Sequence, residues 1–148
     1  MKTLFALLLL SASAYGQSQV ISKTPPPLAY LYDARVVSVL DGDTIKFDVS
    51  LGFNVWTHNQ SVRLLEVYAP ETKGGTQKDK EDAAKVKQFV EQQMSVAKKI
   101  TIQTFKPDSR DLYGRYLAVV WVNDRNLNML INDFMRDSGI TPGGRGKK

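Results

Sequence analysis

The order of β-rich and helical segments is the feature that most constrains the fold of this 148-residue chain. Runs of β-branched and alternating apolar residues predict strands at 34–40, 43–50, 61–68, 99–105 and 116–122. Apolar residues at helical spacing predict helices at 81–97 and 126–137. Because strands and helices do not alternate regularly, the order argues against a parallel doubly wound sheet and favours antiparallel pairing.

The connections between these segments indicate which strands are neighbours. Asp41-Gly42 is a strong tight-turn signal, so the first two strands form a predicted hairpin. Residues 51–60, with Gly52, Asn54 and Asn59, predict a longer connection, and the Gly-rich, charged residues 73–80 predict a mobile loop. We therefore expect a β-rich α+β domain, a five-stranded OB-fold barrel with two packed helices.

Composition divides the chain into four expected parts. They are a signal peptide (1–16), a flexible Pro-containing leader (17–29), an OB-fold domain (30–140) and a flexible basic tail (141–148). Lys2 precedes a leucine-rich run and small residues, which is the signal-peptide pattern, with cleavage after Ala14 or Gly16. The run is too short to span a bilayer, so we expect a secreted or periplasmic protein without a stable membrane anchor after cleavage.

The charge balance makes a polyanion a candidate partner. Twenty Lys and Arg against fifteen Asp and Glu give a net charge of +5, and with 43% apolar residues we expect one compact domain and a monomer. The absence of cysteine excludes disulfides and thiolate metal sites. We expect the single histidine, His58, to be exposed rather than catalytic, and Trp56 and Trp121 to pack in the core or at a barrel end rather than stack on bases.

Four residues form a set that phosphodiester hydrolysis requires. A carboxylate such as Glu71 can activate water, Asp43 can bind a hard cation, and Arg63 and Arg115 can neutralise charge on phosphorus. Each has an ordinary alternative, since Asp41 and Asp43 suit a turn without any metal, and Glu71 and Arg115 suit a loop. An arginine inside the apolar strand around position 63 is harder to explain without an anionic partner.

The motifs that carry these residues are similar to those of the staphylococcal nuclease-like (thermonuclease) family. They are Val39-Leu40-Asp41-Gly42-Asp43-Thr44, Val62-Arg63-Leu64-Leu65, Ala69-Pro70-Glu71-Thr72 and Tyr113-Gly114-Arg115. The segment 50–56 resembles the long hairpin connection of phage and other bacterial members of secreted type. The resemblance covers about residues 32–139 and implies an OB-fold and calcium-dependent cleavage of DNA and RNA.

Site roles follow from the resemblance. It implies that Asp43 and the main-chain carbonyl of Ala69 bind Ca²⁺, with Asp41 as an outer-shell acid. It also implies that Glu71 activates water.

The same resemblance implies the residues that contact the substrate. Arg63 and Arg115 would grip the scissile phosphate, and Tyr113 would contact a nucleotide phosphate. A planar guanidinium suits a phosphate better than an ammonium group does.

Tyr68 departs from the family pattern, which has a second calcium-binding aspartate at this position. A neutral phenol removes one negative charge and a strong oxygen ligand, so Ca²⁺ affinity should fall, and Mg²⁺ or Mn²⁺ stay candidate ions. Ideal strand alternation would place Glu66 on the same side as Tyr68, where it would supply the missing charge.

Three functional interpretations remain open at this point. The first is an exported metal-dependent nuclease acting on DNA, RNA or both with low sequence specificity. The second is a non-catalytic nucleic-acid-binding module with a degenerate metal site, which Tyr68 favours and Glu71 opposes. The third is an exported protein-interaction domain that does not bind nucleic acid.

Overall fold

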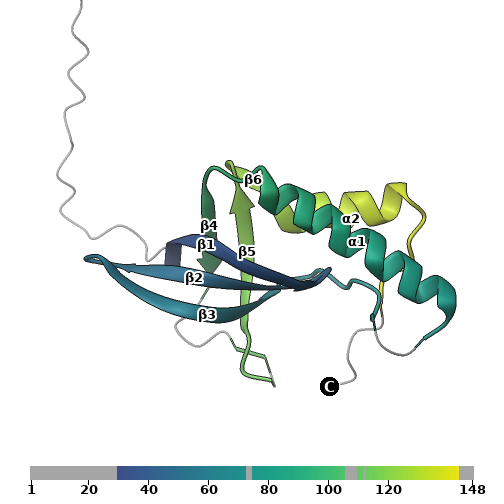
Figure 1. Ribbon diagram of the computed structural model, residues 1–148, viewed down its shortest axis with the longest axis horizontal. Coiled ribbons are helices and arrows are strands. Elements are labelled where there is room, and N and C mark those ends of the chain that lie inside the picture. Colours follow the sequence, from purple (N-terminus) through teal and green to yellow (C-terminus); the bar gives the residue numbers. More distant parts are fainter. Residues whose placement is uncertain (1–29, 73–74, 106–109, 112, 144–148) are drawn as a thin grey trace, which may run out of the picture.

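A computed structural model describes residues 30–72, 75–105, 110–111 and 113–143 (Figure 1). The predicted signal peptide, the predicted leader and the last five residues of the predicted tail lie outside this range. The described elements are β1 (Tyr30–Asp41), β2 (Thr44–Gly52), β3 (Val55–Leu64), α1 (Gln77–Ser95), β4 (Ile100–Thr104), β5 (Tyr116–Val122), β6 (Arg125–Asn126) and α2 (Leu127–Asp137).

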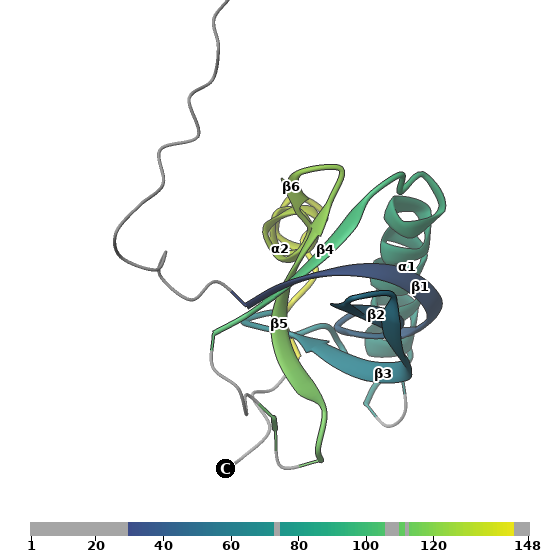
Figure 2. The same ribbon diagram turned by 90° about the vertical axis from the view of Figure 1, so that its left-hand side faces the viewer.

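The strands close into a barrel through one parallel contact. They form a single sheet in the order β3-β2-β1-β4-β5-β6, and β3 pairs in addition with β5. In that parallel pair Val62 lies opposite Tyr116 and Leu64 opposite Ala118. Figures 1 and 2 show the curved sheet closing on itself. The predicted five-stranded OB-fold barrel with two helices is therefore confirmed, with the two-residue β6 as an addition.

Alternating residues of the strands fill the barrel. Ile45 and Phe47 on β2 are fully buried, whereas Lys46 between them points to the opposite face and is half-buried. The two helices pack on β1 and β5, and they meet through Phe89 and Phe134, whose rings stack with centroids 4.3 Å apart. Burial of these alternating apolar side chains is the main source of the domain's stability.

The β2–β3 connection is shorter than the sequence predicted. The expected long connection at 51–60 is wrong, because β2 and β3 extend through it and join at Phe53-Asn54. Both turn residues have positive φ, 49° and 61°, as a two-residue type I′ hairpin turn requires. The polar residues that suggested a loop lie on the exposed strands of this hairpin, where polarity does not oppose strand formation.

Helix α1 begins earlier and β3 ends earlier than predicted. Thr76 caps α1 by accepting a hydrogen bond from the Asp79 N–H, and the Asp79 carboxylate accepts one from the Thr76 N–H. Helix therefore replaces the second half of the loop expected at 73–80. Strand β3 stops at Leu64, and Glu66 has a φ of 59°, which ends the alternation expected up to residue 68.

None of the described helices is both long and apolar enough to cross a membrane.

Asn128 on α2 is a buried polar side chain that joins three segments. Its Nδ2 donates to the carbonyls of Leu65 at 2.9 Å and Ala118 at 3.1 Å, and its Oδ1 accepts from the Val120 N–H at 2.9 Å. These bonds hold the segment that follows β3 against β5. Since that segment leads directly to residues 69–72, Asn128 also supports the position of the site described below.

We expect Asn128→Ala to lower the free energy of unfolding by about 2–3 kcal/mol, because buried carbonyl and amide groups lose their partners. Urea unfolding followed by circular dichroism measures the change. Asn132→Ala is the matched control, since Asn132 is exposed and donates one bond, to the Glu66 carbonyl at 3.2 Å. Equal losses in the two variants would contradict this account.

Candidate active site

A pocket of about 520 Å³ opens at the end of the barrel where the β1–β2 turn, β3 and the segment after β3 meet. The residues that line it are Asp41, Asp43, Ser61, Arg63, Ala69, Pro70, Glu71, Thr72, Tyr113 and Arg115. Seven of the eight predicted site residues are thus brought together. Tyr68 is the eighth, and it is not among the residues that line this pocket.

The β1–β2 turn positions Asp43. The Asp43 N–H donates to Asp41 Oδ1 at 3.1 Å, which fixes the turn through a side chain. Gly42 allows the turn to approach its neighbours, because a Cβ at this position would lie 2.6 Å from Val86 Cγ1 and 2.7 Å from the Ala69 Cβ. The glycine therefore brings Asp43 beside both α1 and the segment that carries Ala69.

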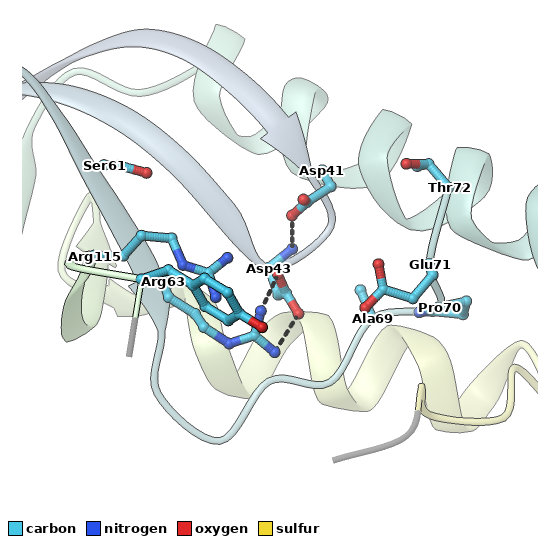
Figure 3. A pocket seen from close by; sticks show the side chains of 10 residues that line it. Asp41, Asp43, Ser61, Arg63, Ala69, Pro70, Glu71, Thr72 and Arg115 are labelled. Atoms are coloured by element: carbon cyan, nitrogen blue, oxygen red, sulfur yellow. Dashed lines mark hydrogen bonds and ion pairs between the residues drawn. The ribbon is translucent and has the colours of Figure 1, made fainter. Parts of the chain in front are cut away.

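Arg63 forms a two-pronged ion pair with Asp43. Its Nη1 lies 3.0 Å from Oδ1 and its Nη2 lies 2.9 Å from Oδ2 of the buried carboxylate (Figure 3). The Thr44 hydroxyl donates to the same Oδ1 at 2.9 Å. Burial and, after it, the adjacent Asp41 carboxyl raise the pKa of Asp43 to about 7 against the opposing effect of Arg63.

Arg115 is held in the pocket by an acid that sequence analysis missed. Asp111 Oδ2 accepts from Arg115 Nε at 2.7 Å and lies 2.6 Å from Nη2, and Asp111 Oδ1 accepts from the N–H groups of Tyr113 and Arg115. Burial favours a higher pKa for Asp111, but the Arg115 contacts outweigh it and lower the pKa. Arg115 Nη1 also donates to the Thr44 hydroxyl at 3.2 Å, which links the two arginines through Thr44 and Asp43. The sequence signal that could have predicted this pair is its spacing, because Asp111 lies four residues before Arg115.

Glu71 lies across the pocket from the two arginines (Figure 3). The Glu71 side chain is exposed. The two residues before it, Ala69 and Pro70, are buried and fix the position of the backbone that carries Glu71. An exposed carboxylate facing two guanidinium groups can accept a proton from a water molecule between them. The residues expected to bind phosphate and to activate water thus line opposite sides of one pocket.

Residues 141–143 of the predicted tail have a defined place beside the site. The Gly143 N–H donates to the Tyr68 carbonyl at 2.8 Å. A Cβ on Gly143 would lie 2.4 Å from the Ala69 carbonyl oxygen, so this oxygen is directly against Gly143. The flexible tail predicted from residue 141 therefore begins too early, and the segment after α2 holds the backbone of the candidate metal-binding residues.

Glu66 does not replace the missing aspartate. Because β3 ends before it and its φ is positive, its side chain does not share a strand face with Tyr68, and it does not line the pocket. The expectation that it restores the negative charge is wrong. Tyr68 itself is half-buried.

The donor atoms fit a hard cation only in part. Ca²⁺ takes six to eight oxygen ligands, whereas residues 30–72, 75–105, 110–111 and 113–143 contain no group of three His, Asp or Glu able to hold a metal ion. Both Asp43 oxygens contact Arg63, and the carbonyl oxygen of Ala69 lies against Gly143. This set fits an ion whose remaining ligands are water and substrate oxygens, and it does not fit a calcium site built from protein groups alone.

Three further predictions concern residues that do not line the pocket. His58 is exposed, as expected, and lies 3.0 Å from Asp48. Trp121 is half-buried and donates to Gln103 Oε1 at 3.1 Å. Trp56 is half-buried on the outward face of the β2–β3 hairpin, so of its two expected places, the core or a barrel end, the core is wrong.

The raised pKa of Asp43 predicts a pH dependence of stability. Between pH values of about 3.9, the pKa in an unfolded chain, and about 7, the folded protein keeps a proton that the unfolded chain releases. The free energy of unfolding should therefore fall as pH rises through this window. Asp43→Asn should remove this part of the slope in urea unfolding measured from pH 4 to 8 without divalent ions, and parallel curves for the two proteins would contradict it.

Comparison with known proteins agrees with this geometry. Residues 61–140 match the family described as staphylococcal nuclease homologue, a segment that includes Arg63, Glu71 and Arg115. The chain is also 32% identical over 117 residues to an uncharacterized protein of Methanocaldococcus jannaschii, an alignment that covers 68% of this chain and 53% of that protein. The chain thus spans about half the length of this curated relative. On the strength of the family match and the barrel, this chain belongs to the staphylococcal nuclease-like family.

Proposed function

We propose that this protein is an exported, divalent-ion-dependent nuclease that hydrolyses phosphodiester bonds of DNA, RNA or both with low sequence specificity. The family and its OB-fold indicate a nuclease-type domain that binds nucleic acid. The observation that carries the specific proposal is the convergence of Arg63, Arg115 and Glu71 on one pocket from three separate segments. Packing alone does not require two guanidinium groups and a carboxylate to face one another.

The two arginines would bind the scissile phosphate and stabilise its transition state. In the free protein each arginine contacts a carboxylate, Arg63 with Asp43 and Arg115 with Asp111. An entering phosphate would become a second anionic partner for both guanidinium groups. Their planar donor pairs match phosphate oxygens, and the charge that develops on phosphorus in the attack strengthens these contacts.

Glu71 would orient and deprotonate the attacking water. As the water oxygen forms its bond to phosphorus, its proton passes to the Glu71 carboxylate, and the bond to the departing ester oxygen breaks. Holding the water and phosphate in one pocket supplies much of the rate gain through orientation. The departing oxygen takes up a proton as it leaves.

Asp43 and the Ala69 carbonyl are the residues that would hold a divalent ion, with Asp41 beyond them. The ion, Ca²⁺ or else Mg²⁺ or Mn²⁺, would supply positive charge next to a non-bridging phosphate oxygen. Because the protein offers few ligands there, the substrate would complete the site. Ion binding and substrate binding should therefore strengthen each other.

A non-catalytic nucleic-acid-binding module is the second candidate function. Two observations favour it: Tyr68 replaces a carboxylate, and Arg63 contacts both oxygens of the Asp43 side chain. Such a module would bind nucleic acid with steep salt dependence and would cleave nothing in any ion. Export and a monomeric state belong to either proposal, supported by the N-terminal sequence and the small single barrel.

We expect Glu71→Gln to lower the rate of plasmid nicking by about 10²–10⁴-fold, because the general base is lost, while DNA binding persists. Nicking is measured on purified mature protein with Ca²⁺, Mg²⁺ and Mn²⁺ separately. Glu66→Gln is the matched control, because Glu66 is exposed and lies outside the pocket. If the wild type binds DNA and nicks it no faster than Glu71→Gln in every ion, the binding module is correct.

We expect Tyr68→Asp to lower the Ca²⁺ concentration for half-maximal nicking by about tenfold, since a carboxylate adds charge and an oxygen ligand. Calcium titration of nicking measures the shift. Tyr68→Asn separates the added charge from the change in size and should shift the curve much less. An unchanged calcium response in Tyr68→Asp would show that position 68 does not face the ion.

A further inference from the structure

The outward side of the β2–β3 hairpin forms a continuous face that begins at the candidate active site. Register pairs Lys46 with Ser61 and Ser50 with Trp56, so these four side chains point to the same side of the sheet. Ser61 also lines the pocket beside Arg63. Lys46, Trp56 and Ser61, together with Arg35 on the neighbouring strand β1, make up what we call the outer hairpin face.

Arg35 and Trp56 form a cation–aromatic pair on this face. The Arg35 guanidinium carbon lies 4.4 Å from the centroid of the Trp56 ring, and Arg35 is exposed on β1, opposite Asp48 of β2. The guanidinium fixes the ring on a solvent-facing sheet rather than in the barrel core. A large aromatic side chain held in this way is a preformed surface for stacking.

The charges on the outer hairpin face favour an anion. Among the described residues, no carboxylate lies within ion-pair distance of the Lys46 ammonium. Asp48 lies on the same side, but its carboxylate already accepts from the Asn59 N–H at 2.9 Å and lies 3.0 Å from His58 Nδ1. Two cations, an aromatic ring and one acid, whose carboxylate already has hydrogen-bond partners, therefore follow the hairpin away from the pocket.

The dimensions suit several nucleotides of an extended strand. Arg63 and Trp56 are seven residues apart on β3, which corresponds to about 23 Å at 3.3 Å per residue. Both helices pack elsewhere, on β1 and β5, and Figures 1 and 2 show the hairpin extending beyond the barrel. The face is thus long enough and open enough to receive a strand that leaves the pocket.

We infer that single-stranded nucleic acid bound at the pocket continues along the outer hairpin face, with phosphates at Lys46 and Arg35 and a base stacked on Trp56. The inference rests on the proposed function and specifies that its substrate is single-stranded. A positively charged path with an aromatic platform is the usual means of binding single strands without sequence preference. Single strands fit better than duplex because base stacking on Trp56 requires an unstacked base.

Tryptophan fluorescence gives a direct test, because the chain has two tryptophans. Trp121→Phe leaves Trp56 as the single reporter, and Trp56→Phe leaves Trp121. In EDTA, which prevents cleavage, a 12-nucleotide oligothymidine should quench the first variant and leave the second unchanged. Unchanged Trp56 fluorescence at an oligonucleotide concentration that saturates binding would overturn the inference.

Affinity gives a second test with an internal control for folding. Trp56→Ala should weaken binding of the 12-nucleotide strand about tenfold more than binding of a trinucleotide, which only the pocket can hold. Lys46→Gln should lower the slope of log affinity against log salt by about 0.7, as the loss of one phosphate contact predicts. Lys98→Gln, an exposed cation between α1 and β4, is the matched control and should leave the slope unchanged.

The outcomes separate this inference from the proposed nuclease. Cleavage of DNA with affinity independent of Trp56 and Lys46 overturns the outer hairpin face alone. Binding that depends on Trp56 without cleavage in any ion supports this face and overturns the nuclease. Quenching of Trp56 by anionic lipid vesicles but not by oligothymidine would overturn the inference that the outer hairpin face binds nucleic acid. It would assign this face to a membrane surface instead.

Discussion

The parallel pairing of β3 with β5 is the interaction on which the rest of the structure depends. It closes an otherwise open sheet into a barrel, and it places Arg63 opposite Leu117, close to Arg115 at the start of β5. Directly after this pair, the Leu64 N–H donates to the Asp43 carbonyl at 2.8 Å and the Leu65 N–H to the Ala118 carbonyl at 2.8 Å. The same few backbone bonds therefore close the core and assemble the pocket. A change that opened this seam would affect stability and the site together.

The pocket keeps its two arginines in place with carboxylates rather than leaving them in water. Asp43 holds Arg63, Asp111 holds Arg115, and the Thr44 hydroxyl connects the two pairs. Because the arginine side chains are already ordered, less entropy is lost when a phosphate binds to them. A weak anion, however, competes poorly with Asp43 and Asp111 for these guanidinium groups. A group with several acceptor oxygens, such as a phosphate, can accept from both guanidinium groups at once, whereas a chloride ion cannot match their planar donor pairs.

The departure at Tyr68 lies within a segment that the rest of the fold holds firmly. Asn128 binds the carbonyl of Leu65, and Gly143 contacts the backbone of Tyr68 and Ala69. These contacts hold the chain that carries Glu71 with a tyrosine at position 68. Loss of one acidic ligand and retention of the arginine pair can coexist, and the proposed function depends on the second feature more than on the first.

The sequence alone determined the elements whose signals are local. The Asp41-Gly42 turn, the helix containing Val86 and Val90, and the identity of most pocket residues followed from periodicity, turn chemistry and the family resemblance. Tertiary structure decided which side chains meet. The pairing of Arg115 with Asp111, the place of Trp56 outside the core and the end of β3 before Glu66 depend on register and on contacts between distant segments. A local pattern fixes on which side of its own strand a residue points, but only the closed barrel fixes whether that side faces the core, the solvent or another segment.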